Sequence, residues 1–331
     1  MRMDELIQNF TKQLARAMEI GEKAKLGKNK FPIRNVVISG LGGSGIGGTI
    51  VSNILRDDVQ VPILVNKEYQ IPAFVNENTL VIISSYSGNT EETLSALMQA
   101  FKKSAQIICI TSGGLVKEYA ETNDIDYVQI DGGSPPRAAF GQSFVELLYI
   151  LNHLGVLQGE FKNYLANAIT LLDSDEHEIQ TKAKEIAKKL KGKIPVIYSD
   201  AKFEGVSIRF RQQINENAKT LCWHAVIPEM NHNELVGWRS KHNDIAVIFL
   251  RNNEDFERNQ ERMEFTKEVV RDYTNEVVEI FSKGEHDIER SMYMIHLTDW
   301  VSYYLAELQG VDAVEVDVIT KLKDKLATHP M

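Results

Sequence analysis

Two kinds of residue pattern are missing from this chain. Only two cysteines occur among 331 residues, Cys109 and Cys222, and neither has a second cysteine at the short spacing of a redox motif or zinc site. No run approaches the roughly 18 apolar residues that a membrane helix requires, and the charged N-terminal stretch lacks the apolar segment of a signal peptide. These absences exclude a disulfide scaffold, and we expect a cytoplasmic protein with reduced thiols and no membrane partner.

An excess of positive charge is also missing. The chain has 37 Lys and Arg against 46 Asp and Glu, for a formal net charge of −9, and the two signs are interspersed. Without a basic patch there is no field to attract a polyanionic backbone, so we expect no nucleic-acid partner. A small anion remains a suitable ligand, because backbone N–H groups and one or two local cations can hold a phosphate whatever the net charge.

What the chain does contain is a regular alternation of short β-branched runs and amphipathic stretches. The apolar content of 43% over 331 residues suffices for two domains. The strands of the first half lack polar alternation, as expected of parallel strands covered by helices on both faces. The pattern predicts strands at 35–40, 61–66, 79–86, 106–112 and 127–131, and helices at about 46–55 and at 90–103, 115–122 and 138–154.

The same pattern recurs in the second half. We therefore expect an α/β protein of two tandem units with parallel sheets, divided as 1–155 and 156–331. A pair of polar helices between Gly155 and Gly192 is expected to pack between the sheets, and the lack of a low-complexity linker indicates an extensive interface. The predicted elements are strands at 193–200, 243–252 and 275–284, and helices at 205–219, 256–273 and 289–310.

The first strand runs into the sequence GLGGSGIGG at residues 40–48, which has the G-x-G-x-x-G spacing of a dinucleotide-binding turn. A dinucleotide site further needs an acidic residue roughly 20 positions on, at the end of the second strand. Asp57 and Asp58 precede that strand, and Glu68 comes late. Ser44 adds a hydroxyl that suits a terminal phosphate, so the turn has three interpretations: a nucleotide site, a phosphate site, or a tight turn with close packing.

A second turn, at residues 84–90, carries three serines, a glycine and a threonine between a buried strand and a helix. Hydroxyl and backbone N–H donors at the carboxyl end of a strand can hold an anion. The alternative is helix capping by Asn89 or Thr90, together with a glutamate of the first helical turn. Capping would account for Thr90 and would leave Ser85 and Ser87 unexplained.

These two turns together carry a resemblance. GLGGSGIGG followed by SSYSGNTEET is similar to the sugar isomerase (SIS) domain, a flavodoxin-like doubly wound unit that binds phosphosugars. Four later stretches resemble the bifunctional phosphoglucose/phosphomannose isomerases, which consist mostly of two tandem SIS domains: SPPRAAFG (134–141), RQQINENAK (211–219), PEMNHNELVGW (228–238) and ITKLKDKL (319–326). The resemblance spans nearly the whole chain. It implies a cofactor-free isomerase of carbohydrate metabolism, in glycolysis and gluconeogenesis, that converts glucose 6-phosphate and mannose 6-phosphate to and from fructose 6-phosphate.

The resemblance also implies roles for individual residues. Glu216 would be the base that moves a proton between carbons one and two, and Arg137 would stabilise the enediolate. His232, reaching the sugar from the neighbouring subunit of a homodimer, and Lys323 would open the ring. The phosphate would lie on the two turns, at Gly43, Ser44, Ser85, Ser87 and Thr90.

Two of these residues have competing interpretations. Glu216 could be an ordinary exposed helix glutamate that pairs with Lys219 or Arg211. His232 lies in a polar stretch rich in histidine and glutamate, which would suit a metal ion. The spacing matches neither H-x-x-x-H nor HExxH on a helix, so we expect no metal site.

The terminal lysine and the functional class have alternatives of their own. Lys321 and Lys325 flank Lys323, and helical periodicity sends the three side chains in different directions, so at most one reaches the site. The alternative function is a phosphosugar-binding SIS regulator without catalytic activity, although no helix-turn-helix or basic output segment accompanies the two units. A third possible function, a nicotinamide oxidoreductase, rests on the glycine turn taken alone. A fourth, amidotransferase-type hexosamine synthesis, would need an N-terminal cysteine domain.

Overall fold

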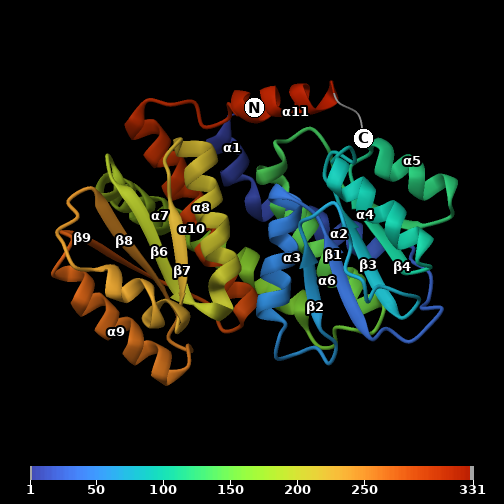
Figure 1. The fold of residues 1–331 in the computed structure, drawn as a ribbon, viewed down its shortest axis with the longest axis horizontal. Coiled ribbons are helices and arrows are strands. Elements are labelled where there is room, and N and C mark those ends of the chain that lie inside the picture. Colours follow the sequence, from blue (N-terminus) through green and yellow to red (C-terminus); the bar gives the residue numbers. More distant parts are fainter. Residues whose placement is uncertain (1, 329–331) are drawn as a thin grey trace.

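The computed structural model describes residues 2–328 and contains two α/β units, each built on a parallel sheet (Figure 1). The expected α/β class with two parallel sheets is confirmed. The division after residue 155 stays a prediction. The strands of the N-terminal sheet are β1 (Asn35–Ser39), β2 (Ile63–Asn66), β3 (Thr79–Ser84), β4 (Gln106–Thr111) and β5 (Asp126–Gln129); those of the C-terminal sheet are β6 (Ile194–Asp200), β7 (Trp223–Ile227), β8 (Ile245–Arg251) and β9 (Glu276–Phe281).

Both sheets are wound in the same way. The strand order is β2-β1-β3-β4-β5 in the first and β7-β6-β8-β9 in the second, so the second repeats the first without its fifth strand. The first order is that of flavodoxin-like folds, in which winding reverses between the first and third strands and ligands bind outside the carboxyl ends there. The turns that follow β1 and β3 therefore border the crevice where this fold binds ligands.

Helices cover both faces of each sheet. The N-terminal unit contains α1 (Met3–Gln8), α2 (Phe10–Lys23), α3 (Gly42–Ile54), α4 (Glu91–Lys102), α5 (Gly114–Thr122) and α6 (Phe140–His153). The C-terminal part contains α7 (Phe161–Leu190), α8 (Glu204–Ala218), α9 (Glu257–Arg271), α10 (Asp287–Gln309) and α11 (Asp317–Ala327). Short 3-10 helices occupy Pro136–Ala139, Ala201–Phe203, Glu229–His232 and Glu234–Gly237.

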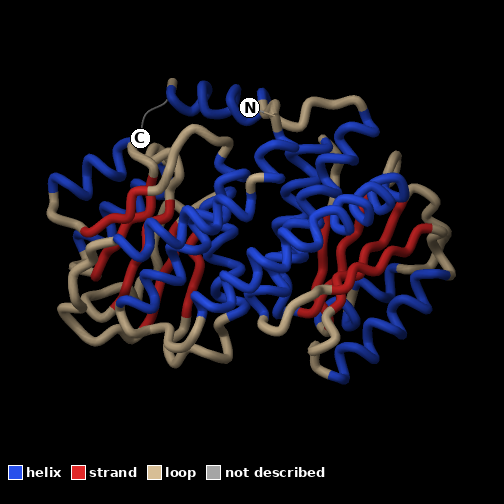
Figure 2. Tube along the Cα trace, turned by 180° about the vertical axis from the view of Figure 1, so that it is seen from behind, coloured by secondary structure: helices blue, strands red, loops and turns tan. Residues whose placement is uncertain are grey.

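One hydrophobic core lies under both sheets. Val36 and Ile38 of β1 point into it, while Val37 between them packs on the outer face, as the two-residue period of a strand requires. Ile197 of β6 belongs to the same core as Val36. Figure 2 shows helices filling the space between the two sheets, and the contacts of α3 with α8 and of α2 with α7 join the units there. This is the extensive interface that the absence of a linker predicts.

The segment between the sheets differs from the sequence prediction. The expected pair of helices is a single helix, α7, of 30 residues, which packs along α10. The prediction of two helices was wrong, because the polar run at 173–178 lies inside one continuous helix. No glycine or proline interrupts the helix, and its buried residues recur at helical spacing on both sides of that run, at Leu165, Leu172, Ile179 and Ala183.

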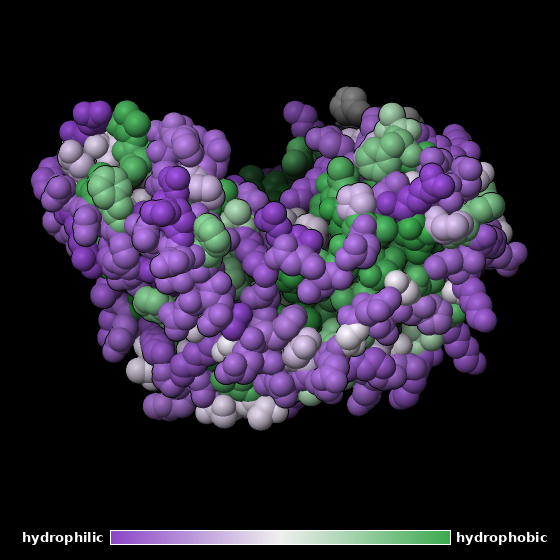
Figure 3. Space-filling view, turned by 90° about the horizontal axis from the view of Figure 1, so that it is seen from below, coloured by the Kyte–Doolittle hydropathy of each residue, from purple (hydrophilic) through white to green (hydrophobic). Residues whose placement is uncertain are grey.

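The outline of the molecule follows from this arrangement. Figure 3 views the molecule from below and shows the two units as two lobes with a notch between them. Hydrophobic side chains gather on the right-hand lobe, which is the N-terminal unit. No helix in the described part of the chain combines the length and apolarity that a membrane span requires.

Glu146, on α6, is a fully buried carboxyl whose two oxygens accept no hydrogen bond from residues 2–328. Burial raises the pKa of Glu146 to about 8. The folded state therefore binds this proton more tightly than the unfolded chain does, so the free energy of unfolding falls as pH rises from about 5 to about 8, by up to about 1.4 kcal/mol per pH unit. We expect Glu146→Gln to flatten the pH dependence of the melting temperature over this range. Superimposable pH profiles of the two proteins would contradict this role for Glu146.

Candidate active site

The glycine turn after β1 is built from close backbone contacts. A Cβ on Gly45 would collide with the carbonyl oxygen of Gly40, and a Cβ on Gly40 would lie 2.6 Å from the carbonyl oxygen of Ser84. The close-packing interpretation of the glycines is therefore confirmed, and it is compatible with a phosphate site. Helix α3 begins at Gly42, four residues earlier than predicted, so the N-terminus of the helix lies within the turn.

Ser44 connects this turn with the second one. Its side chain is 6% exposed, and its Oγ accepts a hydrogen bond of 3.0 Å from the backbone N–H of Tyr86. The Oγ of Ser84 also approaches the carbonyl oxygen of Ser44, at 3.5 Å. The two turns meet because β1 and β3 are neighbours in the sheet.

The second turn presents its hydroxyl groups at different depths. Ser85 is 2% exposed and donates from Oγ to the Oγ1 of Thr90 at 3.4 Å. Ser87 is exposed, and its Oγ accepts a hydrogen bond of 3.3 Å from the N–H of Asn89. Thr90 occupies the N-cap position of α4, yet its side chain makes no capping hydrogen bond. The side-chain capping interpretation of Thr90 was therefore wrong. Gly88, at φ +70, gives the turn a left-handed residue.

Arg137 and Glu216 meet where the two units join. Arg137 comes from the 3-10 helix before α6 and is 5% exposed; Glu216 comes from the last turn of α8. The Nη1 of Arg137 lies 3.4 Å from the Oε2 of Glu216. Burial lowers the pKa of Arg137, and the charge of Glu216 opposes that shift. Glu216 thus pairs with Arg137, and neither Lys219 nor Arg211 takes its carboxylate.

Three further acceptors fix the arginine in place. Its Nε donates to the Oδ1 of Asn217 at 2.9 Å, and its Nη2 donates to the carbonyl oxygens of Ala313 and Val314 at 2.7 and 3.1 Å. Gly43 lies against the same segment, since a Cβ there would stand 3.0 Å from the Cα of Arg137 and would overlap Pro136. The glycine turn, the arginine and the end of α8 therefore form one packed cluster.

Arg209 and Asp299 form buried polar contacts that support this cluster. Both nitrogens of the Arg209 fork donate to the carbonyl oxygen of Arg137 at 3.2 Å, and its Nη2 pairs with the Oδ2 of Asp299 at 2.5 Å. No role was predicted from the sequence for Arg209 or for Asp299. Polar residues inside the apolar stretch of α10, such as Asp299 and Ser302, were the available signal.

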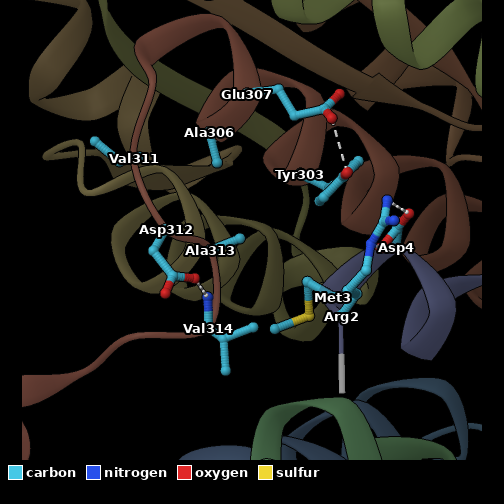
Figure 4. Close-up of a pocket in the computed structure, with 10 residues that line it drawn as sticks. All are labelled: Arg2, Met3, Asp4, Tyr303, Ala306, Glu307, Val311, Asp312, Ala313 and Val314. Atoms are coloured by element: carbon cyan, nitrogen blue, oxygen red, sulfur yellow. Dashed lines mark hydrogen bonds and ion pairs between the residues drawn. The ribbon is translucent and has the colours of Figure 1, made fainter.

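Lys219 is a further neighbour that the sequence did not single out as part of the site. It follows α8 and donates from Nζ to the carbonyl oxygens of Glu216, Asp312 and Glu315 at 2.6, 2.7 and 2.8 Å. Two of these acceptors belong to the connection between α10 and α11, residues 310–316, which we call the strap. Figure 4 shows the other side of the strap, where Asp312, Ala313 and Val314 line a cavity of about 480 Å³.

His232 lies far from this cluster within one chain. Helix α8 leads from the carboxyl end of β6 back to the amino end of β7, which places Glu216 near the start of β7. His232 follows the carboxyl end of β7 and is exposed. The two residues therefore lie at opposite ends of the strand, and one chain does not bring them together.

Lys323 stands on α11, which crosses the upper edge of the molecule in Figure 1 and has no buried residue. The side chain of Lys323 is exposed and has no hydrogen bond or ion pair with residues 2–328. Lys321 and Lys325 are exposed as well. The structure brings together Gly43, Ser44, Ser85, Ser87, Thr90, Arg137 and Glu216, whereas His232 and Lys323 lie apart from them.

The fold comparisons place this arrangement in a class. A family model described as the bacterial phospho-glucose isomerase C-terminal SIS domain matches residues 179–326. The tagatose-6-phosphate ketose/aldose isomerase of Escherichia coli has a TM-score of 0.70 at 12% identity, covering 95% of each chain. The C-terminal domain of glucosamine-fructose-6-phosphate aminotransferase from Francisella tularensis has a TM-score of 0.73 at 16% identity, covering 95% of this chain and 96% of that one. The chain therefore has the fold of the SIS proteins.

Curated relatives narrow the class to a family. The bifunctional phosphoglucose/phosphomannose isomerase of Caldicellulosiruptor bescii is 39% identical, over 98% of this chain and 99% of the relative. The enzyme of the same name from Aquifex aeolicus is 37% identical, over 92% and 94% of the two chains. The chain belongs to the bifunctional phosphoglucose/phosphomannose isomerase family.

Proposed function

We propose that this protein interconverts glucose 6-phosphate and mannose 6-phosphate with fructose 6-phosphate through an enediol intermediate. The observation that carries the proposal is the Arg137–Glu216 pair, held beside two hydroxyl-bearing turns at the point where this fold binds ligands. The family's named activity requires such an arrangement, a carboxylate and a cation next to a phosphate site.

The chemistry assigned to the pair is a proton transfer. The carboxylate of Glu216 would accept the proton from carbon two of the open-chain aldose and return it to carbon one, while the proton on the oxygen of carbon two moves to the oxygen of carbon one. Both are proton shifts within the sugar, so the reaction needs no oxidant or reductant. The negative charge that develops on the enediolate oxygens would face the guanidinium of Arg137. Arg137 is already fixed by Asn217 and the strap, so it would need no reorganisation when that charge forms.

The two turns would hold the phosphate group. Ser44 and Ser87 each accept a backbone N–H through Oγ, which leaves their O–H groups able to donate to an anion. Ser85 and Thr90 lie between them, and Gly43 brings the backbone of α3 close to the site. The start of α3 adds the positive end of a helix dipole.

A coupled assay with glucose 6-phosphate and with mannose 6-phosphate tests the function. We expect production of fructose 6-phosphate from both substrates, with no metal or nucleotide needed by the isomerase itself. Binding of fructose 6-phosphate without turnover of either aldose would instead support the non-catalytic regulator.

Ring opening by His232 would need a second copy of the chain. Strand β7 is at the edge of its sheet, and exposed apolar side chains accompany it: Leu221, Trp223 and Val236 are 81, 38 and 61% exposed. A twofold axis across this edge would place the carboxyl end of one β7 against the amino end of the other. His232 of each copy would then face the Glu216 end of its partner, which supports a homodimer with shared sites.

Mixing two inactive variants tests this sharing. Glu216→Gln and His232→Ala chains, unfolded and refolded together, should form hybrid dimers in which one site has both native residues and the other has neither. We expect recovery of up to about a quarter of the wild-type activity, because half of the dimers are hybrids with one intact site. Each variant refolded alone is the control, and a mixture no more active than its components would refute shared sites.

A further inference from the structure

Lys219 has an unusual place at the end of α8. Its backbone is left-handed, at φ +54, a position that helices usually give to glycine because a Cβ is strained there. It follows Glu216 by three residues, so the two belong to the same last turn and its cap. A lysine at such a position indicates that its side chain is needed for something that glycine cannot supply.

Every N–H donor of the Lys219 ammonium group has a hydrogen-bond acceptor. An ammonium has three N–H donors, and here each has a backbone acceptor, the carbonyl oxygens of Glu216, Asp312 and Glu315. The Oε2 of Glu315 lies 3.8 Å away and adds a charge partner. No donor of Lys219 is left for a substrate, so it can act on a reaction only through the groups that it holds.

Those groups belong to the strap. Lys219 holds the carbonyl oxygens of Asp312 and Glu315, and Arg137 holds those of Ala313 and Val314 between them. Four successive carbonyls thus converge on two cations. Figure 4 shows the Oδ1 of Asp312 accepting the N–H of Val314 at 2.7 Å, a turn that bends the strap toward these cations.

The strap in turn carries α11. That helix starts at Asp317, two residues beyond the last anchored carbonyl, and it has no buried residue of its own. The strap is therefore the segment that joins α11 to the packed part of the molecule. The carbonyl of Glu216 and the base of α11 are tied to one ammonium group.

We propose that Lys219 is a positioning residue. Its ammonium group clamps the strap to the end of α8, and this clamp fixes the positions of Glu216, Arg137 and α11 relative to one another. The catalytic role of Glu216 rests on the proposed function. The clamp itself rests on the three hydrogen bonds and on the left-handed backbone.

Three substitutions at Lys219 separate the clamp from a simple helix cap. Lys219→Met removes the ammonium and keeps the strained backbone, Lys219→Gly removes both, and Lys219→Arg keeps a cation. We expect Met and Gly to lower kcat by about 10- to 100-fold, the effect of a small misplacement of reacting groups, and KM to stay nearly unchanged because the phosphate turns are untouched. Lys219→Arg should recover most of kcat. Lys188→Met, on the exposed face of α7, is the control for loss of one surface charge.

Glycine makes the test decisive. It is the residue best suited to the left-handed cap, so a lysine that served only to end α8 could be replaced by glycine without loss of activity. Wild-type kcat in Lys219→Gly would overturn the proposal. A fall in kcat equal in all three variants would also overturn it, since arginine would then fail to replace the ammonium.

Hydrogen exchange gives a readout that does not depend on turnover. Amides of residues 310–328 should exchange faster in Lys219→Met and Lys219→Gly than in the wild type, and at the wild-type rate in Lys219→Arg. Unchanged exchange in all variants would show that no clamp exists. Glu216→Gln, measured alongside, distinguishes the two proposals: its full activity would refute the base assignment, while the exchange rates would still decide whether Lys219 clamps the strap.

Discussion

Replacing Glu216 by glutamine is expected to lower kcat by about 10²- to 10⁴-fold, the usual contribution of a general base. The amide keeps the shape of the side chain but cannot accept a proton from carbon two. Arg137 loses its charge partner and keeps its hydrogen bonds to Asn217, Ala313 and Val314, so the fold should remain. The coupled assay measures the loss, and the melting temperature verifies that the variant is folded.

A control for this experiment lies on the same helix. Glu204 begins α8, at the opposite end from Glu216, and its side chain is 41% exposed. Glu204→Gln removes the same charge from the same element and should keep wild-type activity. A folded Glu216→Gln protein that turns over both aldose phosphates as fast as Glu204→Gln would remove Glu216 from the role of base.

Replacing Gly43 by alanine is expected to cause the second large loss. A Cβ at Gly43 would overlap the carbonyl group of Pro136, whose carbon would be 2.8 Å away, and would stand 3.0 Å from the Cα of Arg137. Neither contact is with a flexible side chain, so the segment that carries Arg137 has to move. A shift of about 1 Å at such a site costs up to about 100-fold in rate, and overpacking costs about 1 to 3 kcal/mol of stability.

Gly132→Ala is the matched control for this second substitution. Its Cβ would lie 3.5 Å from the side chain of Ser112, an ordinary contact. We expect wild-type kcat/KM for Gly132→Ala and a strong reduction for Gly43→Ala, with melting temperatures measured for both. Equal activity of the two variants would mean that the approach of α3 to Arg137 is not needed for catalysis.

The fold could be predicted largely because its signals are local. Strands such as β1 and β8 are short, apolar and bounded by turns, and burial on both faces leaves a continuous apolar pattern. Helix α7 was predicted as two helices because a charged run within a helix has the same composition as a loop. Only the spacing of its buried residues across that run distinguishes the two.

The site was predictable only in part. Ser44, Ser85 and Ser87 could be proposed as site residues because they follow strands, and Arg137 and Glu216 because their surrounding motifs resemble a family. Lys219 gave no signal of this role, since its partners are backbone carbonyls and any sequence could supply them. The strap packs against two cations through tertiary contacts. Such contacts of an irregular segment produce no periodic pattern in a single sequence.

The continuous core beneath both sheets has a consequence for how activity is lost. Val36 and Ile197 come from different halves of the chain and share one buried layer, so neither half can open without exposing apolar surface of the other. We therefore expect heat or denaturant to unfold both halves in a single cooperative transition. Arg137 and Glu216 are contributed by opposite halves, so separation of the halves breaks their ion pair. We therefore expect turnover to be lost in the first unfolding event.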